Sequence, residues 1–198
     1  MTIPVPEKTY LPRHMRRALE AALADTPVVC LLGPRQCGKS TLSRHCEPER
    51  HYVSLDDKAY LDLARADPQG FVDDLPEKVA IDEVQRAPEL SLAIKRSVDA
   101  NRKPGRFLLT GSANLLQLPR LADSLAGRME CLSLHPLTVS EIRRSPGRFL
   151  EEFMAGMLRP EITASGTPRV SELPDLLVAG GYPESIKRDP ERADRWRR

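Results

Sequence analysis

The sequence has no long hydrophobic run. Its longest apolar stretches are short segments such as VVCLL at residues 28–32, whereas a membrane-spanning helix needs about 18 or more apolar residues in succession. The first residues, MTIPVPEKTY, also lack the cationic start and apolar segment that mark a secretory signal peptide. We therefore expect no association with a membrane.

Cysteine is scarce, with four residues in a chain of 198, and no two of them have CxxC spacing. This scarcity excludes a disulfide-stapled scaffold and favours a reducing, cytoplasmic location. Cys30 and Cys131 fall within apolar, strand-like runs, which predicts buried thiols. A zinc site formed by Cys46, His45 and His51 is disfavoured, because no second ligand pair has metal-site spacing.

The chain also lacks a strong excess of either charge, with 30 basic and 28 acidic residues and a net charge of +2. Such a balance gives no support for nucleic-acid binding. The last residues, ERADRWRR, are locally basic, and a solvated helix face is a simpler interpretation than a nucleic-acid patch. Nucleic acid therefore stays an open partner class without positive support.

Strand-like and helix-like segments alternate along most of the chain. Short apolar runs predict five strands, at residues 28–32, 51–55, 78–81, 106–112 and 130–134. Helical spacing predicts helices at residues 11–24 (with Pro12 in the first turn), 39–46, 58–66, 69–74, 89–100 and 114–125. This alternation indicates an α/β fold, a three-layer α/β/α sandwich with a five-stranded, mostly parallel sheet. Ligands bind such sheets beyond the carboxyl ends of the strands.

The pattern changes after about residue 136, where Pro and Gly punctuate the chain. We predict a first domain over residues 11–142, followed by a helix and a linker within residues 143–171. The helix is expected at residues 149–158 and the linker at residues 159–171. Residues 172–198 are predicted to be the beginning of a truncated second domain.

The segment GPRQCGKS at residues 33–40 matches the phosphate-binding pattern G-x-x-x-x-G-K-[ST], between a strand and a helix. Its two glycines permit backbone angles that turn successive N–H groups inward to hold an anion. Lys39 is predicted to neutralise the β- and γ-phosphates, Ser40 to coordinate Mg²⁺, and Thr41 to lie near the α-phosphate. The predicted nucleotide-binding residues are Gly33, Pro34, Arg35, Gln36, Cys37, Gly38, Lys39, Ser40 and Thr41.

Cys37 lies inside this loop and has two interpretations. If the helix N-terminus and Lys39 activate it, it is a reactive thiol whose alkylation blocks nucleotide binding. The simpler alternative is a small residue that fills space.

A second motif, VAIDE at residues 79–83, is an apolar strand that ends in two carboxylates. After a P-loop this is the Walker B pattern. Asp82 is predicted to hold Mg²⁺ through its water shell, because Mg²⁺ dehydrates reluctantly. Glu83 is predicted to orient and deprotonate the attacking water. Asp56 and Asp57 also end a strand, and a helix cap is the simpler interpretation there.

Two further residues are candidates for sensing or stabilising charge during hydrolysis. Ser112, at the end of the predicted fourth strand, is the predicted γ-phosphate sensor, with Thr110 and Asn114 as rivals. Arg128 is either an arginine finger, acting within one subunit or across an interface between copies, or an ordinary surface arginine.

Several motifs together resemble a group of prokaryotic AAA-superfamily ATP-binding proteins: LLGPRQCGKSTL, YVSLDD, VAIDEVQRAPEL, PGRFLLTGSANLL, SLAGR and LHPLTVSEI. The resemblance covers about residues 11–142. It implies a P-loop NTPase fold that binds ATP, with magnesium and water held by Asp82 and Glu83 and a sensor at Ser112. It also implies that residues 173–198 begin a C-terminal domain, mostly missing here, of poorly understood function.

The sequence thus favours an Mg²⁺-dependent ATPase, slow in isolation, whose cycle drives or switches an attached or partner domain. Assembly into a homo-oligomer is left open. The alternative is a nucleotide-binding regulatory or interaction scaffold with little hydrolysis, conceivably DNA-associated. A small-molecule phosphotransferase is weaker, because Glu83 favours water activation and no arginine-rich lid is evident.

Overall fold

The computed structural model describes residues 10–112, 124–145, 148–157 and 173–197. The chain divides into two compact units. One unit is Met15–His135, and the other combines Met1–His14 with Pro136–Arg198. The predicted first domain, residues 11–142, therefore includes the whole of the first unit and short stretches of the second.

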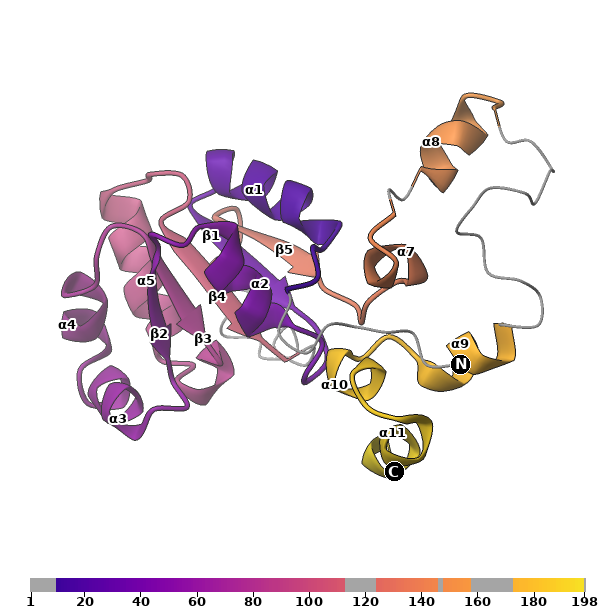
Figure 1. Ribbon diagram of the computed structural model, residues 1–198. Helices are drawn as coiled ribbons and strands as arrows, with labels where there is room; N and C mark the ends of the chain where they lie inside the picture. The colour runs from indigo at the N-terminus through magenta and orange to yellow at the C-terminus, as the bar shows by residue number, and fades with distance from the viewer. Residues whose placement is uncertain (1–9, 113–123, 146–147, 158–172, 198) are drawn as a thin grey trace. The chain divides into compact units, whose positions relative to one another are not determined.

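The unit Met15–His135 is built around the predicted five-stranded sheet (Figure 1). The strands lie in the order β2-β3-β4-β1-β5, and every neighbouring pair is parallel. The α/β fold is thus confirmed, with a sheet that is wholly rather than mostly parallel. The strands are β1 (Val28–Leu32), β2 (His51–Ser54), β3 (Val79–Asp82), β4 (Phe107–Gly111) and β5 (Met129–Ser133).

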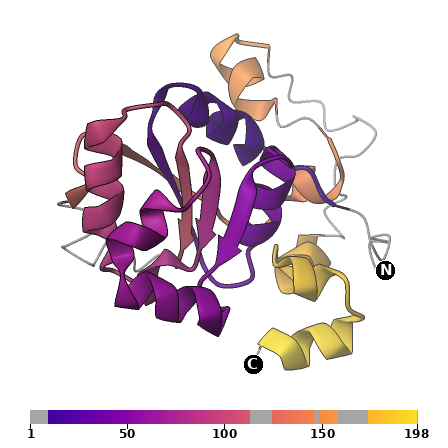
Figure 2. The same cartoon turned by 90° about the vertical axis from the view of Figure 1, so that its left-hand side faces the viewer.

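Helices on both sides of the sheet complete three layers. α1 and α2 contact each other as well as the central strands, and α3, α4 and α5 form a second group (Figures 1 and 2). Their bounds are α1 (Met15–Asp25), α2 (Lys39–Cys46), α3 (Lys58–Ala66), α4 (Pro68–Asp73) and α5 (Leu90–Ala100), with a 3₁₀ turn at Val84–Arg86. Most of the helix predicted at residues 114–125 lies outside the described residues.

The start of the first helix differs from the prediction. α1 begins at Met15, so Pro12 precedes the helix and does not occupy its first turn. The reason is that the chain just before α1 is engaged elsewhere. Glu141 accepts hydrogen bonds from Arg13 Nε at 3.1 Å and from the backbone N–H of His14 at 2.8 Å.

Alternation of side chains along each strand gives the two faces of the sheet different surroundings. Cys30, Ile81 and Leu109 belong to the main apolar core together with residues of α3, α4 and α5. Asp82 and Thr110 come one position later in β3 and β4, so they point to the opposite face, where α2 lies. Burial on both faces explains why β1, β3 and β4 are continuous apolar runs.

The described part of the second unit consists of short helices. They are α7 (Val139–Ile142), α8 (Phe149–Met154), α9 (Leu173–Ala179), α10 (Pro183–Ile186) and α11 (Pro190–Arg197). α8 ends earlier than the predicted helix at residues 149–158, and the predicted linker at residues 159–171 lies outside the described residues. None of the helices in the described ranges is long and apolar enough to cross a membrane.

The cysteines differ from the prediction at one position. Cys30 is fully buried in β1, as expected, but Cys131 is exposed. The reason lies in the strand order: β5 is an edge strand that pairs only with β1, where Cys30 is the register partner of Cys131. A hydrogen bond with Cys30 lowers the pKa of the Cys131 thiol to about 7.

We expect Cys131 to react fastest of the four cysteines with an aromatic disulfide reagent, because the other three are buried. Only the thiolate is nucleophilic, so its lowered pKa makes the rate rise between about pH 6 and about pH 8. The Cys131→Ser variant should lose the fast phase of the absorbance change. Survival of that phase in the variant would contradict this assignment.

Candidate nucleotide-binding site

The loop after β1 has a shape that its glycines allow. A β-carbon on Gly33 would lie 2.2 Å from the backbone oxygen of Leu134, so only glycine fits there. Gly38 has a φ of 104° and Gln36 a φ of 64°, both in the left-handed region. α2 begins at Lys39, directly after the loop. The loop therefore leads into a helix N-terminus, as phosphate binding requires.

Lys39 is folded back onto the loop that precedes it. Its Nζ donates to the carbonyl oxygens of Gly33 at 3.0 Å and Pro34 at 2.9 Å, and the residue is only 5% exposed. A buried ammonium group needs acceptors, which these carbonyls provide. The positive charge thus lies within the loop that is predicted to hold phosphate.

Asp82, the last residue of β3, lies beside the start of α2 and is 5% exposed. Its Oδ2 accepts hydrogen bonds from the hydroxyls of Ser40 at 2.9 Å and Tyr52 at 2.5 Å. Its Oδ1 accepts one from the hydroxyl of Thr110. The donors belong to α2, β2 and β4, so one carboxylate joins three elements. The predicted loop and acidic strand end are therefore in direct contact.

The chemistry of this contact fits Mg²⁺, which prefers oxygen ligands in proteins. Ser40 Oγ and Asp82 Oδ2 lie 2.9 Å apart, close enough to face one ion and its water shell. Within the described part of the chain, no group of three or more His, Cys, Asp or Glu side chains is placed to hold a metal. A magnesium ion here therefore needs phosphate oxygens and water for its other ligands, as is usual for Mg²⁺.

Glu83 follows β3 in a left-handed backbone conformation, with a φ of 58°. This conformation costs a non-glycine residue about 1–2 kcal/mol, and such strain clusters at functional sites. Gln85 Nε2 donates a hydrogen bond to Glu83 Oε2. The sequence prediction missed Gln85, for which the only signal is its position two residues after a predicted catalytic carboxylate.

Thr110, Ser112 and Asn114 were the three candidates for the sensor. Thr110 is fully buried and donates to Asp82, so it is the β4 side chain in contact with the site's carboxylate. Ser112 directly follows β4 and is half-buried, at the carboxyl end of the strand. Asn114 lies outside the described residues. The structure thus ties Thr110 to the site through Asp82, while the sensor role of Ser112 stays a prediction.

The acidic pair after β2 has separate partners. Asp57 caps α3 by accepting the backbone N–H of Ala59 at 2.9 Å, which confirms the predicted helix cap. Asp56 forms an ion pair with Arg86 on the surface.

Arg128 lies at the amino ends of the strands, whereas the phosphate loop lies at their carboxyl ends. It precedes β5, and its backbone oxygen accepts the N–H of Val28, the first residue of β1, at 3.2 Å. The phosphate loop follows the other end of β1, about 13 Å further along. The Arg128 guanidinium instead pairs with Asp99 at 2.5 Å. This placement does not suit a finger for the subunit's own phosphates, and it leaves two interpretations: an ordinary surface arginine or a finger that acts across an interface between copies.

Cys37 is fully buried, and its thiol donates to the backbone oxygen of Leu134 at 3.4 Å. A reagent cannot reach this thiol in the described conformation. The structure therefore favours the space-filling interpretation over a reactive cysteine.

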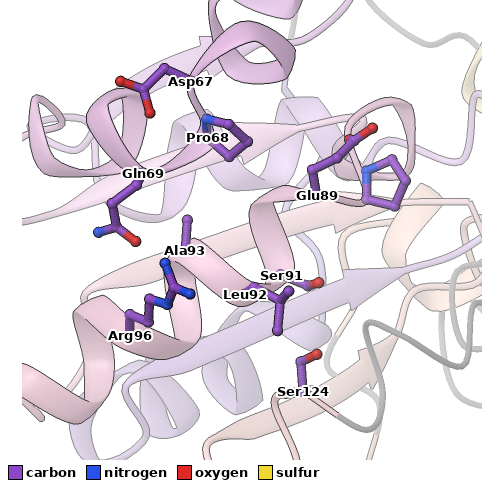
Figure 3. Close-up of a pocket in the computed structure, with 10 residues that line it drawn as sticks. Asp67, Pro68, Gln69, Glu89, Ser91, Leu92, Ala93, Arg96 and Ser124 are labelled. Atoms are coloured by element: carbon purple, nitrogen blue, oxygen red, sulfur yellow. The ribbon is translucent and has the colours of Figure 1, made fainter.

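A separate cavity of about 650 Å³ opens between α4 and α5 (Figure 3). The described residues that line it are Asp67, Pro68, Gln69, Pro88, Glu89, Ser91, Leu92, Ala93, Arg96 and Ser124. They include no predicted site residue, no glycine-rich turn and no end of a strand. This cavity is therefore distinct from the nucleotide site.

We expect Gly33→Ala to weaken binding of Mg²⁺-ATP at least tenfold and to lower the free energy of unfolding by about 1–3 kcal/mol. The added methyl group would overlap the Leu134 backbone oxygen. Gly127→Ala is the control, because Gly127 has nothing within 4 Å and only its φ of 71° opposes alanine. This control should lose about 1–2 kcal/mol and keep its affinity. Calorimetry measures the affinity for Mg²⁺-ATP, and urea unfolding measures the free energy of unfolding. Wild-type affinity in Gly33→Ala would contradict the loop geometry.

The chain resembles known proteins in sequence. It is 39% identical over 152 residues to the uncharacterized proteins Mb2031c of Mycobacterium bovis and Rv2008c of Mycobacterium tuberculosis. Each match covers 76% of this chain but 33% of the relative. The chain therefore spans about a third of the length of the curated relatives it matches.

Solved structures share the fold. The Walker-type ATPase PABY2304 of Pyrococcus abyssi has a TM-score of 0.54 at 18% identity, covering 99% of this chain and 75% of that one. The Orc1 protein of Aeropyrum pernix, solved in complex with DNA, has a TM-score of 0.51 at 18% identity, covering 99% and 64%. A family model described as an AAA domain matches residues 25–143, more than half of the chain. The chain therefore belongs to the AAA-domain family and is an AAA-superfamily ATP-binding module with a P-loop NTPase fold.

Proposed function

We propose that this chain binds ATP together with Mg²⁺ and hydrolyses it to ADP and phosphate. The observation that supports this most strongly is the hydrogen bond of 2.9 Å between Ser40 Oγ and Asp82 Oδ2. It brings the hydroxyl of the phosphate loop and the carboxylate of β3 to one point at the carboxyl edge of the sheet. That edge is where α/β folds of this kind bind their ligands.

The binding roles follow from the groups present. Backbone N–H groups of the loop after Pro34, at residues 35–38, and the N-terminus of α2 hold the phosphates. Lys39 exchanges its contacts with the carbonyls of Gly33 and Pro34 for contacts with the β- and γ-phosphate oxygens. Ser40 and Asp82 are the proposed holders of Mg²⁺, which, when bound, stabilises negative charge that develops on the phosphates.

Glu83 is the proposed general base for the attacking water. Gln85 already donates to its Oε2, which leaves Oε1 to orient a water molecule and accept its proton. Ser112 is proposed to sense the γ-phosphate from the end of β4.

We also propose a wider role for the cycle of ATP binding and hydrolysis. Hydrolysis is proposed to drive or switch an attached C-terminal domain, since the curated relatives are about three times as long as the matched region. Arg128 is proposed to act on a neighbouring copy in a homo-oligomer. Because such a finger is worth about 10³–10⁵ in rate, the chain alone should be slow. The free cysteines suit a cytoplasmic location.

Two substitutions separate binding from chemistry. Glu83→Gln should lower ATP turnover by about 10²–10⁴-fold, because the amide cannot accept the proton, while ATP affinity stays within about twofold. Lys39→Ala should lose most of the affinity, because the charge opposite the phosphates is gone. Phosphate release measures the turnover of ATP, and calorimetry measures the affinity for ATP.

The same experiment distinguishes the enzyme from a nucleotide-binding scaffold. Wild-type protein that binds Mg²⁺-ATP without turnover above that of Glu83→Gln would contradict hydrolysis and support the scaffold. Wild-type protein that binds no ATP would contradict both functions.

A further inference from the structure

Tyr52 lies on the same face of the sheet as Asp82. β2 and β3 pair in parallel with Tyr52 opposite Ala80 and Ser54 opposite Asp82. Tyr52 and Asp82 are therefore two register positions apart, a rise of about 7 Å along the strands. The long phenol ring spans this offset, and its hydroxyl reaches the carboxylate at the carboxyl end of β3.

The phenol shares one carboxylate oxygen with the phosphate loop. Tyr52 donates to Asp82 Oδ2 at 2.5 Å, and Ser40 donates to the same atom at 2.9 Å. Thr110 donates to the other oxygen, Oδ1. The carboxylate plane is thus fixed from both sides before any ligand is present, and a group oriented in advance loses less entropy when it binds an ion.

The ring of Tyr52 is itself held in place. The guanidinium carbon of Arg44 lies 3.9 Å from the ring centroid, a cation–π contact made from α2. α2 also carries Lys39 and Ser40, so the ring links β2 to the helix that follows the phosphate loop.

The hydroxyl of Tyr52 donates to the same carboxylate oxygen as Ser40. Its hydrogen bond therefore still holds Asp82 when the Ser40 hydroxyl turns its lone pairs toward a metal.

We propose that Tyr52 is a positioning residue for magnesium, whose hydroxyl orients Asp82 so that Mg²⁺ strengthens ATP binding. This inference rests on the proposed function. It assigns to Tyr52 the magnesium-dependent part of the affinity and not the affinity for the nucleotide itself, which the loop and Lys39 provide.

The test is Tyr52→Phe, which removes the hydroxyl but keeps the ring and its contact with Arg44. ATP affinity is measured by calorimetry in Mg²⁺ and again in EDTA. We expect affinity in Mg²⁺ to fall about 10- to 100-fold, the usual effect of losing a group that orients a metal ligand. Affinity in EDTA should stay within about twofold, because the loop and Lys39 bind the nucleotide without the metal.

Tyr60→Phe is the matched control, since Tyr60 lies on α3 and is 38% exposed. It should bind like the wild type in both buffers. Arg44→Gln, which frees the ring but keeps the hydroxyl, should weaken Mg²⁺-ATP about two- to fivefold and leave EDTA binding unchanged.

The contrary outcomes distinguish failure of the positioning role from failure of the proposed function. Equal losses for Tyr52→Phe in Mg²⁺ and in EDTA would overturn the positioning role and show a general effect on the site. Unchanged affinity in Mg²⁺ would overturn it as well, while the proposed ATPase function would stand. Absence of ATP binding by the wild type would overturn both.

Discussion

The hydroxyl contacts of the Asp82 carboxylate connect the phosphate loop to the sheet. A carboxylate that is only 5% exposed is costly to bury unless donors satisfy its oxygens. Ser40, Tyr52 and Thr110 supply these donors from α2, β2 and β4. A shift of the first turn of α2 against the central strands would therefore take the Ser40 donor away from this buried charge. The position of the loop is a consequence of this arrangement.

The loop is braced on its other side by the chain that leaves β5. The N–H of Leu134 donates to the Leu32 carbonyl at 2.6 Å, and its own carbonyl accepts the Cys37 thiol. The same carbonyl is what a side chain at position 33 would meet. Gly33 is thus required by packing against the chain that follows β5 as well as by phosphate chemistry. β1 lies between β4 and β5. The loop that follows β1 is therefore contacted on one side through Asp82 and on the other side by Leu134.

Much of the fold could be predicted because strands buried on both faces are continuous apolar runs, as in β1, β3 and β4. The loop and Asp82 were predictable because their chemistry requires fixed residue types at fixed spacing. Tyr52 and Gln85 were not, because their hydrogen bonds depend on strand register and side-chain conformation. The exposure of Cys131 depends on the order of the strands, and the distance of Arg128 from the site depends on which end of its strand it occupies. A local sequence pattern does not reveal the order of the strands.

The most direct test is a crystal structure of the protein with Mg²⁺ and a non-hydrolysable ATP analogue. Our account predicts the ion between Ser40 and Asp82, with Tyr52 still bonded to Asp82. It also predicts that Lys39 Nζ has left the Gly33 and Pro34 carbonyls for phosphate oxygens. A nucleotide bound elsewhere, with the contacts of Lys39 and Ser40 unchanged, would contradict the account.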